Sequence, residues 1–122
     1  MGSIMVVRDI TLGSLYDARA KLTDLIIAWT PDPSAESAAR DSLDQLILER
    51  DRVNGAINAI IATAFAGIAT PELVSAAQDL ARLTGQLKNF GKAVAGLNAV
   101  IKLADAVVQG AARVIALASK VS

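Results

Sequence analysis

The chain has 122 residues, and its twelve basic and twelve acidic side chains give a formal net charge of zero. Apolar residues make up 53% of it and aromatic residues only 3%, so it can bury a core, but one of small side chains. Cysteine and histidine are both absent, which excludes disulfides, thiolate or imidazole metal ligands, and catalysis by either residue. We therefore expect one domain over residues 1–122 that is not an enzyme and holds no metal or cofactor.

The N-terminal part predicts a first helix over about residues 12–29. Leu15, Ala18, Leu22, Leu25 and Trp29 alternate three and four residues apart, which is the spacing of one helical face. The prolines that follow at 31 and 33 end this helix. Residues 1–10 fit either a short strand or the lead-in to the helix, and the lack of another strand favours the lead-in. The apolar run at 4–7 is too short for a signal peptide, so we expect a cytoplasmic location.

A second helix is predicted over about residues 33–66, opened by an Asp-Pro pair that suits a helix start. Two polar residues, Arg50 and Asn54, fall on its apolar stripe, where such residues often fix register or oligomeric state; contact with a ligand or partner is the alternative. We expect the acids of this helix to lie off the stripe on a solvated face. The stripe consists of Leu43, Leu46, Ile47, Val53, Ile57, Ile60, Ile61, Ala64 and Phe65, and the acids are Glu36, Asp41, Asp44, Glu49 and Asp51.

A third helix begins at Thr70-Pro71-Glu72, a cap followed by proline and an acid. An uncharged apolar seam with alternating spacings of three and four then runs to Ala118. It passes through Gly91 without losing phase, which favours one continuous helix to Ser119, with a break near Gly91 as the alternative. The seam residues are Leu73, Ala76, Leu80, Leu83, Leu87, Phe90, Val94, Leu97, Ile101, Ala104, Val108, Ala111, Ile115 and Ala118.

The sequence thus predicts an all-α antiparallel bundle with coiled-coil-like packing, made of three long helices, or of four if the last is broken near Gly91. A continuous third helix of about 75 Å would outreach a second helix of about 50 Å. Its overhanging end would remain apolar on more than one face, so we expect either the N-terminal helix or a second copy of the chain to cover it, and we favour the second copy. The interaction residues predicted on this basis are Val100, Leu103, Val107, Val114 and Leu117, together with Arg50 and Asn54.

Two further classes of partner are weighed against self-association. Basic residues of the third helix lack interleaved aromatic residues, and the net charge is zero, so we expect no nucleic-acid binding. The longest uncharged run, Val53–Pro71, is interrupted by asparagine, threonine and glycine, so a membrane partner is not favoured. We predict a non-enzymatic protein–protein interaction and assembly module that self-associates, with a second protein as another possible partner. A membrane-active helical protein, such as a pore-former subunit, is the alternative.

Overall fold

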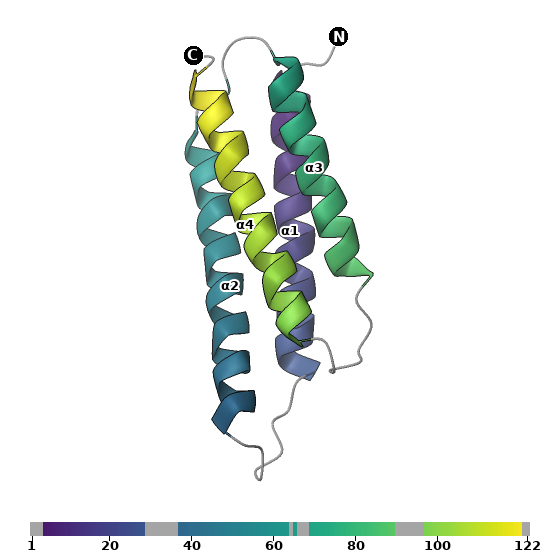
Figure 1. Cartoon of the computed structure of the whole chain (residues 1–122). Helices are drawn as coiled ribbons and strands as arrows, with labels where there is room; N and C mark the ends of the chain where they lie inside the picture. Colours follow the sequence, from purple (N-terminus) through teal and green to yellow (C-terminus); the bar gives the residue numbers. More distant parts are fainter. Residues whose placement is uncertain (1–3, 29–36, 64, 66–68, 90–96, 121–122) are drawn as a thin grey trace.

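The computed structural model describes residues 4–28, 37–63, 65, 69–89 and 97–120. Every regular element in these ranges is an α-helix: α1 (Ile4–Ala28), α2 (Ser37–Ala62), α3 (Pro71–Lys88) and α4 (Leu97–Lys120). The helices run side by side in alternating directions (Figure 1). The predicted all-α bundle is confirmed, in its four-helix form.

Helices α2 and α3 follow each other in the chain but lie at opposite corners of the bundle, and this placement sets the neighbours of each helix. The pairs α1–α2 and α3–α4 are antiparallel hairpins, whereas α1 also packs beside α3 and α2 beside α4 (Figure 1). Helices α1 and α4 approach each other across one diagonal. In the described part of the chain, α2 and α3 occupy the other diagonal and do not touch.

The favoured continuous third helix is wrong, because α3 ends at Lys88 and a separate helix, α4, begins at Leu97 and packs antiparallel against it (Figure 1). The backbone N–H of Asn89 donates to the carbonyls of Gly85 and Leu87 at the end of α3. The apolar register also slips by one residue across this turn. A seven-residue repeat continued from Leu87 would arrive at Ile101, yet the deeply buried residue is Val100. Gly91 itself lies outside the described residues.

The buried face of α4 alternates valine with alanine. Short side chains at these positions allow two helix backbones to approach closely, which is consistent with contact between α4 and α1, whose buried residues include the small Ser14 and Ala18. Phe65, in the α2–α3 connection, is also part of the core. The alternating residues of α4 are Val100, Ala104, Val107, Ala111, Val114 and Ala118.

Several predicted helix ends can be compared with the structure. Residues 4–10 belong to α1, so the lead-in interpretation is confirmed and the predicted start at 12 was too late. The start of α3 is confirmed in detail, since the Thr70 side chain accepts a hydrogen bond from the backbone N–H of Leu73 at 3.1 Å, with Pro71 as the first helical residue. The expected stop at Trp29 lies outside the described residues, whereas α2 ends at Ala62, before the expected end near residue 66.

Two helical glycines predict opposite outcomes for the same substitution. A Cβ at Gly55 would meet nothing within 4 Å, so Gly55→Ala should raise the free energy of unfolding by about 0.5–1 kcal/mol. A Cβ at Gly110 would lie 3.3 Å from Cδ1 of Leu80, which is fully buried and held by the core. Gly110→Ala should therefore show less of this gain, or a loss. Urea unfolding of both variants tests this, and an equal gain at both sites would contradict it.

Candidate functional site

The interaction residues predicted on α4 do not form an exposed surface of the folded chain. Val107 and Val114 are fully buried and Val100 is 4% exposed, while Leu103 and Leu117 are half-buried against the same core. The physical reason is the turn after Lys88, which folds α4 back onto α3. Without a continuous third helix there is no overhanging end for a second copy to cover.

Arg50 and Asn54 lie on the side of α2 that faces α1, outside the core. The Arg50 guanidinium reaches outward to Asp51, with 3.5 Å between Nη2 and Oδ1. The Asn54 Oδ1 accepts a hydrogen bond of 2.8 Å from Nη1 of Arg19 on α1. This contact joins the two helices of one hairpin, so it can fix the register of α1 against α2 within the chain. A role for Arg50 or Asn54 in contact with a partner stays a prediction.

The exposed apolar surface is concentrated on α1. Seven large apolar or aromatic side chains are exposed in the described part of the chain, and five belong to this helix: Met5, Val6, Ile10, Tyr16 and Ile27. The opposite side of α1 supplies Val7, Leu15, Ala18 and Leu22 to the core. Because α1 is apolar on both sides and only one side lies in the core, its other side leaves an apolar surface that a partner could cover.

The exposed side of α1 has a regular pattern. Val6, Gly13, Ala20 and Ile27 are all exposed and follow each other at intervals of seven residues, so they lie in one row along the helix. Tyr16 lies beside this row, between Gly13 and Ala20. We call these five residues the outer row of α1. A Cβ at Gly13 would meet nothing within 4 Å, so packing inside the chain does not require glycine there.

A second feature is a groove between α2 and α4 with an acid at its base. It measures about 330 Å³ and is lined by Gln45, Leu48, Glu49, Arg52, Ile101, Lys102 and Asp105. Only 8% of the Glu49 side chain is exposed, so the expectation that this acid lies on a solvated face is wrong. Asp44 and Asp51 are exposed, as expected. Glu49 was missed because it occupies a core position, between Leu46 and Val53.

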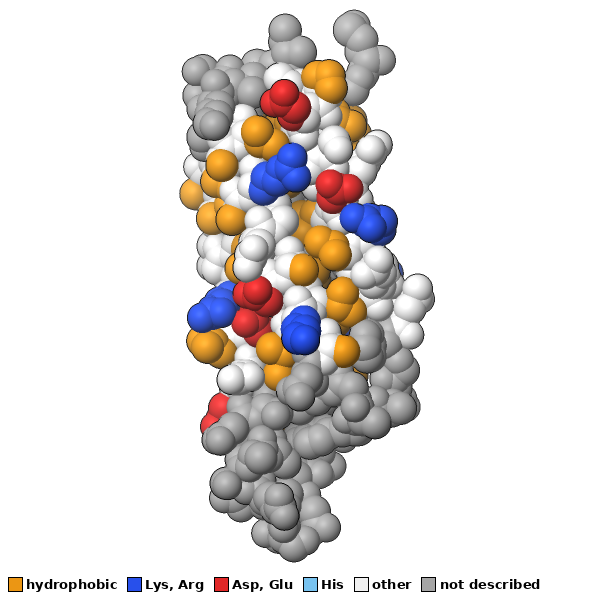
Figure 2. All heavy atoms as spheres, viewed as in Figure 1, with side chains coloured by type: hydrophobic (Ala, Val, Ile, Leu, Met, Phe, Trp, Pro, Cys, Tyr) orange, Lys and Arg blue, Asp and Glu red, His pale blue; other side chains and the backbone are white. Residues whose placement is uncertain are grey.

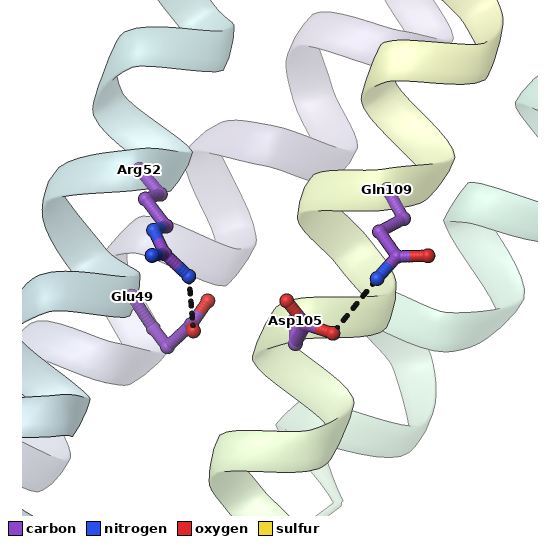
Figure 3. Close-up of polar contacts among 4 residues, drawn as sticks. All are labelled: Glu49, Arg52, Asp105 and Gln109. Carbon is purple, nitrogen blue, oxygen red and sulfur yellow. Dashed lines mark hydrogen bonds and ion pairs between the residues drawn. The ribbon is translucent and has the colours of Figure 1, made fainter.

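The carboxylates of Glu49 and Asp105 project toward each other from α2 and α4 (Figure 3). Oε1 of Glu49 accepts a hydrogen bond of 3.1 Å from Nη1 of Arg52, and Oδ2 of Asp105 accepts one of 2.9 Å from Nε2 of Gln109. Oε2 of Glu49 is buried and has no hydrogen-bond partner. Burial raises the pKa of the Glu49 carboxyl, Asp105 raises it further, and Arg52 opposes the rise. The groove therefore holds a buried acceptor that lacks a donor.

The face formed by α2, α3 and α4 carries both charge signs. Figure 2 shows Lys and Arg side chains interspersed with acidic and apolar ones, without a large field of one sign. One of these bases, Lys88 on α3, pairs with an acid of α1, with 3.4 Å between its Nζ and Oδ2 of Asp17. No cluster of three acids that could hold a metal ion occurs among the described residues.

None of the helices, as far as the chain is described, combines the length and the apolar character required to cross a bilayer. The run from Val53 that suggested an inserting hairpin instead places Val53, Ile57 and Ile60 in the core. No protein-family model, no curated protein and no solved structure matches this chain. The two surface features described above, the outer row of α1 and the groove at Glu49, must carry the functional argument.

The raised pKa of Glu49 predicts how stability responds to pH. The folded state holds the Glu49 proton more tightly than the unfolded state, so the free energy of unfolding contributed by this group falls as pH rises from the ordinary carboxyl pKa through the raised one. Glu49→Gln removes that titration. The stability of the variant relative to the native chain should therefore improve as pH rises above the ordinary carboxyl pKa, and it should level off once pH exceeds the raised pKa of Glu49.

Urea unfolding at several pH values measures this difference. Asp51→Asn removes an exposed carboxylate from the same helix and is the matched control, for which we expect no comparable improvement. A Glu49→Gln variant whose relative stability worsens as pH rises would show that the ion pair with Arg52 outweighs burial.

Proposed function

We propose that this protein is a non-enzymatic helical assembly module that pairs with a second copy of itself through the outer row of α1. The observation that supports this is the concentration of exposed apolar side chains on one helix that already supplies the core from its other side. Covering such an apolar stripe lowers the free energy of the protein in water by roughly 25 cal/mol for each Å² of apolar surface buried.

The outer row suits a copy of itself in antiparallel orientation. The row runs from residue 6 to residue 27, so its midpoint lies between Tyr16 and Asp17. About a two-fold axis at that point, Val6 of one copy faces Ile27 of the other, and the small Gly13 faces the small Ala20. Large side chains thus meet at the two ends while small ones let the backbones approach near the centre, and each patch of the surface meets its own counterpart, as a two-fold interface requires.

Electrostatics contributes little to this pairing. Helix α1 contains three acids and three bases, so two copies carry no net charge, but in this register the exposed Asp9 of one copy lies opposite the exposed Asp24 of the other, a like-charge pair that salt screens. Asp17 is already engaged by Lys88, and Arg19 by Asn54 and by the ring of Tyr16, 5.1 Å from its centroid. A second protein with a similar apolar helix is the other partner class consistent with this surface, and a cytoplasmic location stays a prediction.

The proposal predicts that Gly13→Glu abolishes self-association. The added carboxylate would enter the centre of the helix pair, where the two backbones approach, and should weaken dimerisation by at least about tenfold, that is about 1.4 kcal/mol. The measurement is sedimentation velocity of the full chain over a roughly hundredfold concentration range, with the mass of each species determined.

Gly55→Glu is the matched control, since Gly55 is also an exposed glycine inside a helix with open space at its Cβ. It should leave dimerisation unchanged. A native chain that stays monomeric at every concentration would refute the proposal, as would equal effects of the two variants. Release of dye from liposomes by the native chain would favour the membrane-active alternative.

A further inference from the structure

We propose that the groove between α2 and α4 binds a small zwitterion of the apolar α-amino-acid class, with its ammonium group on Glu49 and Asp105 and its carboxylate toward Lys102. This inference does not depend on the proposed dimer, because the groove and the outer row of α1 share no residue.

The ammonium position follows from the buried acceptor. Oε2 of Glu49 is buried and has no hydrogen-bond partner, and only 8% of the Glu49 side chain is exposed to solvent. A buried carboxylate oxygen without a donor destabilises the fold, because it has lost its hydrogen bonds to water and gained none from the protein. An ammonium group carries three N–H donors and no acceptor, so it can bond to this oxygen and to the facing carboxylate of Asp105 together (Figure 3).

The carboxylate position follows from the charge balance of the groove. Two acids and two bases line it, so a simple cation entering the groove would find no net attraction. Arg52 is already bonded to Oε1 of Glu49, whereas Lys102 forms no ion pair with any described residue. Lys102 precedes Asp105 by three residues on α4, which is one turn of the helix. A ligand whose ammonium and carboxylate groups are attached to the same carbon can therefore contact the two acids and Lys102 at once.

The apolar side chain of the ligand is matched by the remaining wall of the groove. Leu48 from α2 and Ile101 from α4 line it beside the charged residues. The volume of about 330 Å³ lies at the small end of the range for ligand pockets, about 300–1,000 Å³, which suits a molecule of the size of leucine.

The experiment is an NMR titration of the full chain, following backbone amide shifts in α2 and α4, with three related probes. L-Leucine carries both charges, isopentylamine lacks the carboxylate, and isocaproate lacks the ammonium. Leucine should bind, and both analogues should bind at least about tenfold more weakly, since each loses a charge-assisted contact. An amine that binds as tightly as leucine would overturn the zwitterion assignment, and the absence of shifts with all three probes would overturn the site.

Variants separate the two ends of the ligand. Glu49→Gln and Asp105→Asn, on different helices, should each weaken leucine binding by about tenfold or more, and the retained helical circular dichroism of either one shows that folding is intact. Lys102→Ala should weaken leucine binding but leave isopentylamine unchanged. Asp51→Asn is the control outside the groove and should bind leucine as the native chain does. Unchanged leucine affinity in Glu49→Gln and Asp105→Asn would place the ligand elsewhere and overturn the assignment.

The Gly13→Glu variant distinguishes this inference from the proposed function. It should bind leucine like the native chain even where it no longer dimerises, because Gly13 lies on the outer row and not in the groove. Loss of leucine binding in Gly13→Glu would mean that the site depends on the dimer, which contradicts the independence stated above.

Discussion

The close contact between α1 and α4 across the bundle is the constraint on which the rest of the structure depends. It requires small side chains at the centre, and the alternating valines and alanines of α4 with Ala18 of α1 provide them. A bundle with one short diagonal has one long one, so α2 and α3 are held apart at opposite corners. The scarcity of aromatic residues is thus a condition of this fold, because bulky side chains would push the diagonal helices apart.

The same constraint explains where functional surface remains. Helix α1 contacts all three other helices, yet its outer side keeps an apolar row that no part of the described chain covers. Helices α2 and α4 belong to different hairpins and pack against each other. The acid Glu49 is buried between them, at a position where an apolar residue would close the core. One feature is an unpaired apolar face, and the other is a polar defect in an otherwise apolar seam. They differ in chemistry and suit different partners, a helix in one case and a small polar molecule in the other.

Sequence periodicity identified the helices more reliably than the faces that they bury. The all-α class, the cap at Thr70 and the helical state of residues 4–10 follow from local chemistry, and local chemistry decided them in the structure as well. The break after Lys88 could not be recognised in the same way. An apolar sequence with valine and alanine next to the seam supports two registers one residue apart, and only packing against α1 selects the face that contains Val100.

Glu49 shows a second limit of such patterns. The predicted stripe of α2 combined buried residues such as Leu46 and Val53 with the exposed Ile61, and it was wide enough to take in Arg50 while leaving Glu49 outside. The buried face is shifted, through Leu46, Glu49 and Val53, at intervals of three and four residues. A search for apolar repeats passes over an acid at such a position. The sequence does contain the signal, because an acid spaced three and four residues from two buried apolar neighbours is a candidate for burial.

The placement of α2 and α3 at opposite corners also bears on how the chain folds. The molecule consists of two hairpins, α1–α2 and α3–α4. Contacts within a hairpin join residues close in sequence, whereas contacts between the hairpins join residues far apart in sequence. Closing distant contacts has the larger entropic cost, so the hairpins are expected to form early and their docking to be the slow step. The groove at Glu49 takes one wall from each hairpin. It therefore forms only when docking is complete, and a ligand bound there would stabilise the docked arrangement of the two hairpins.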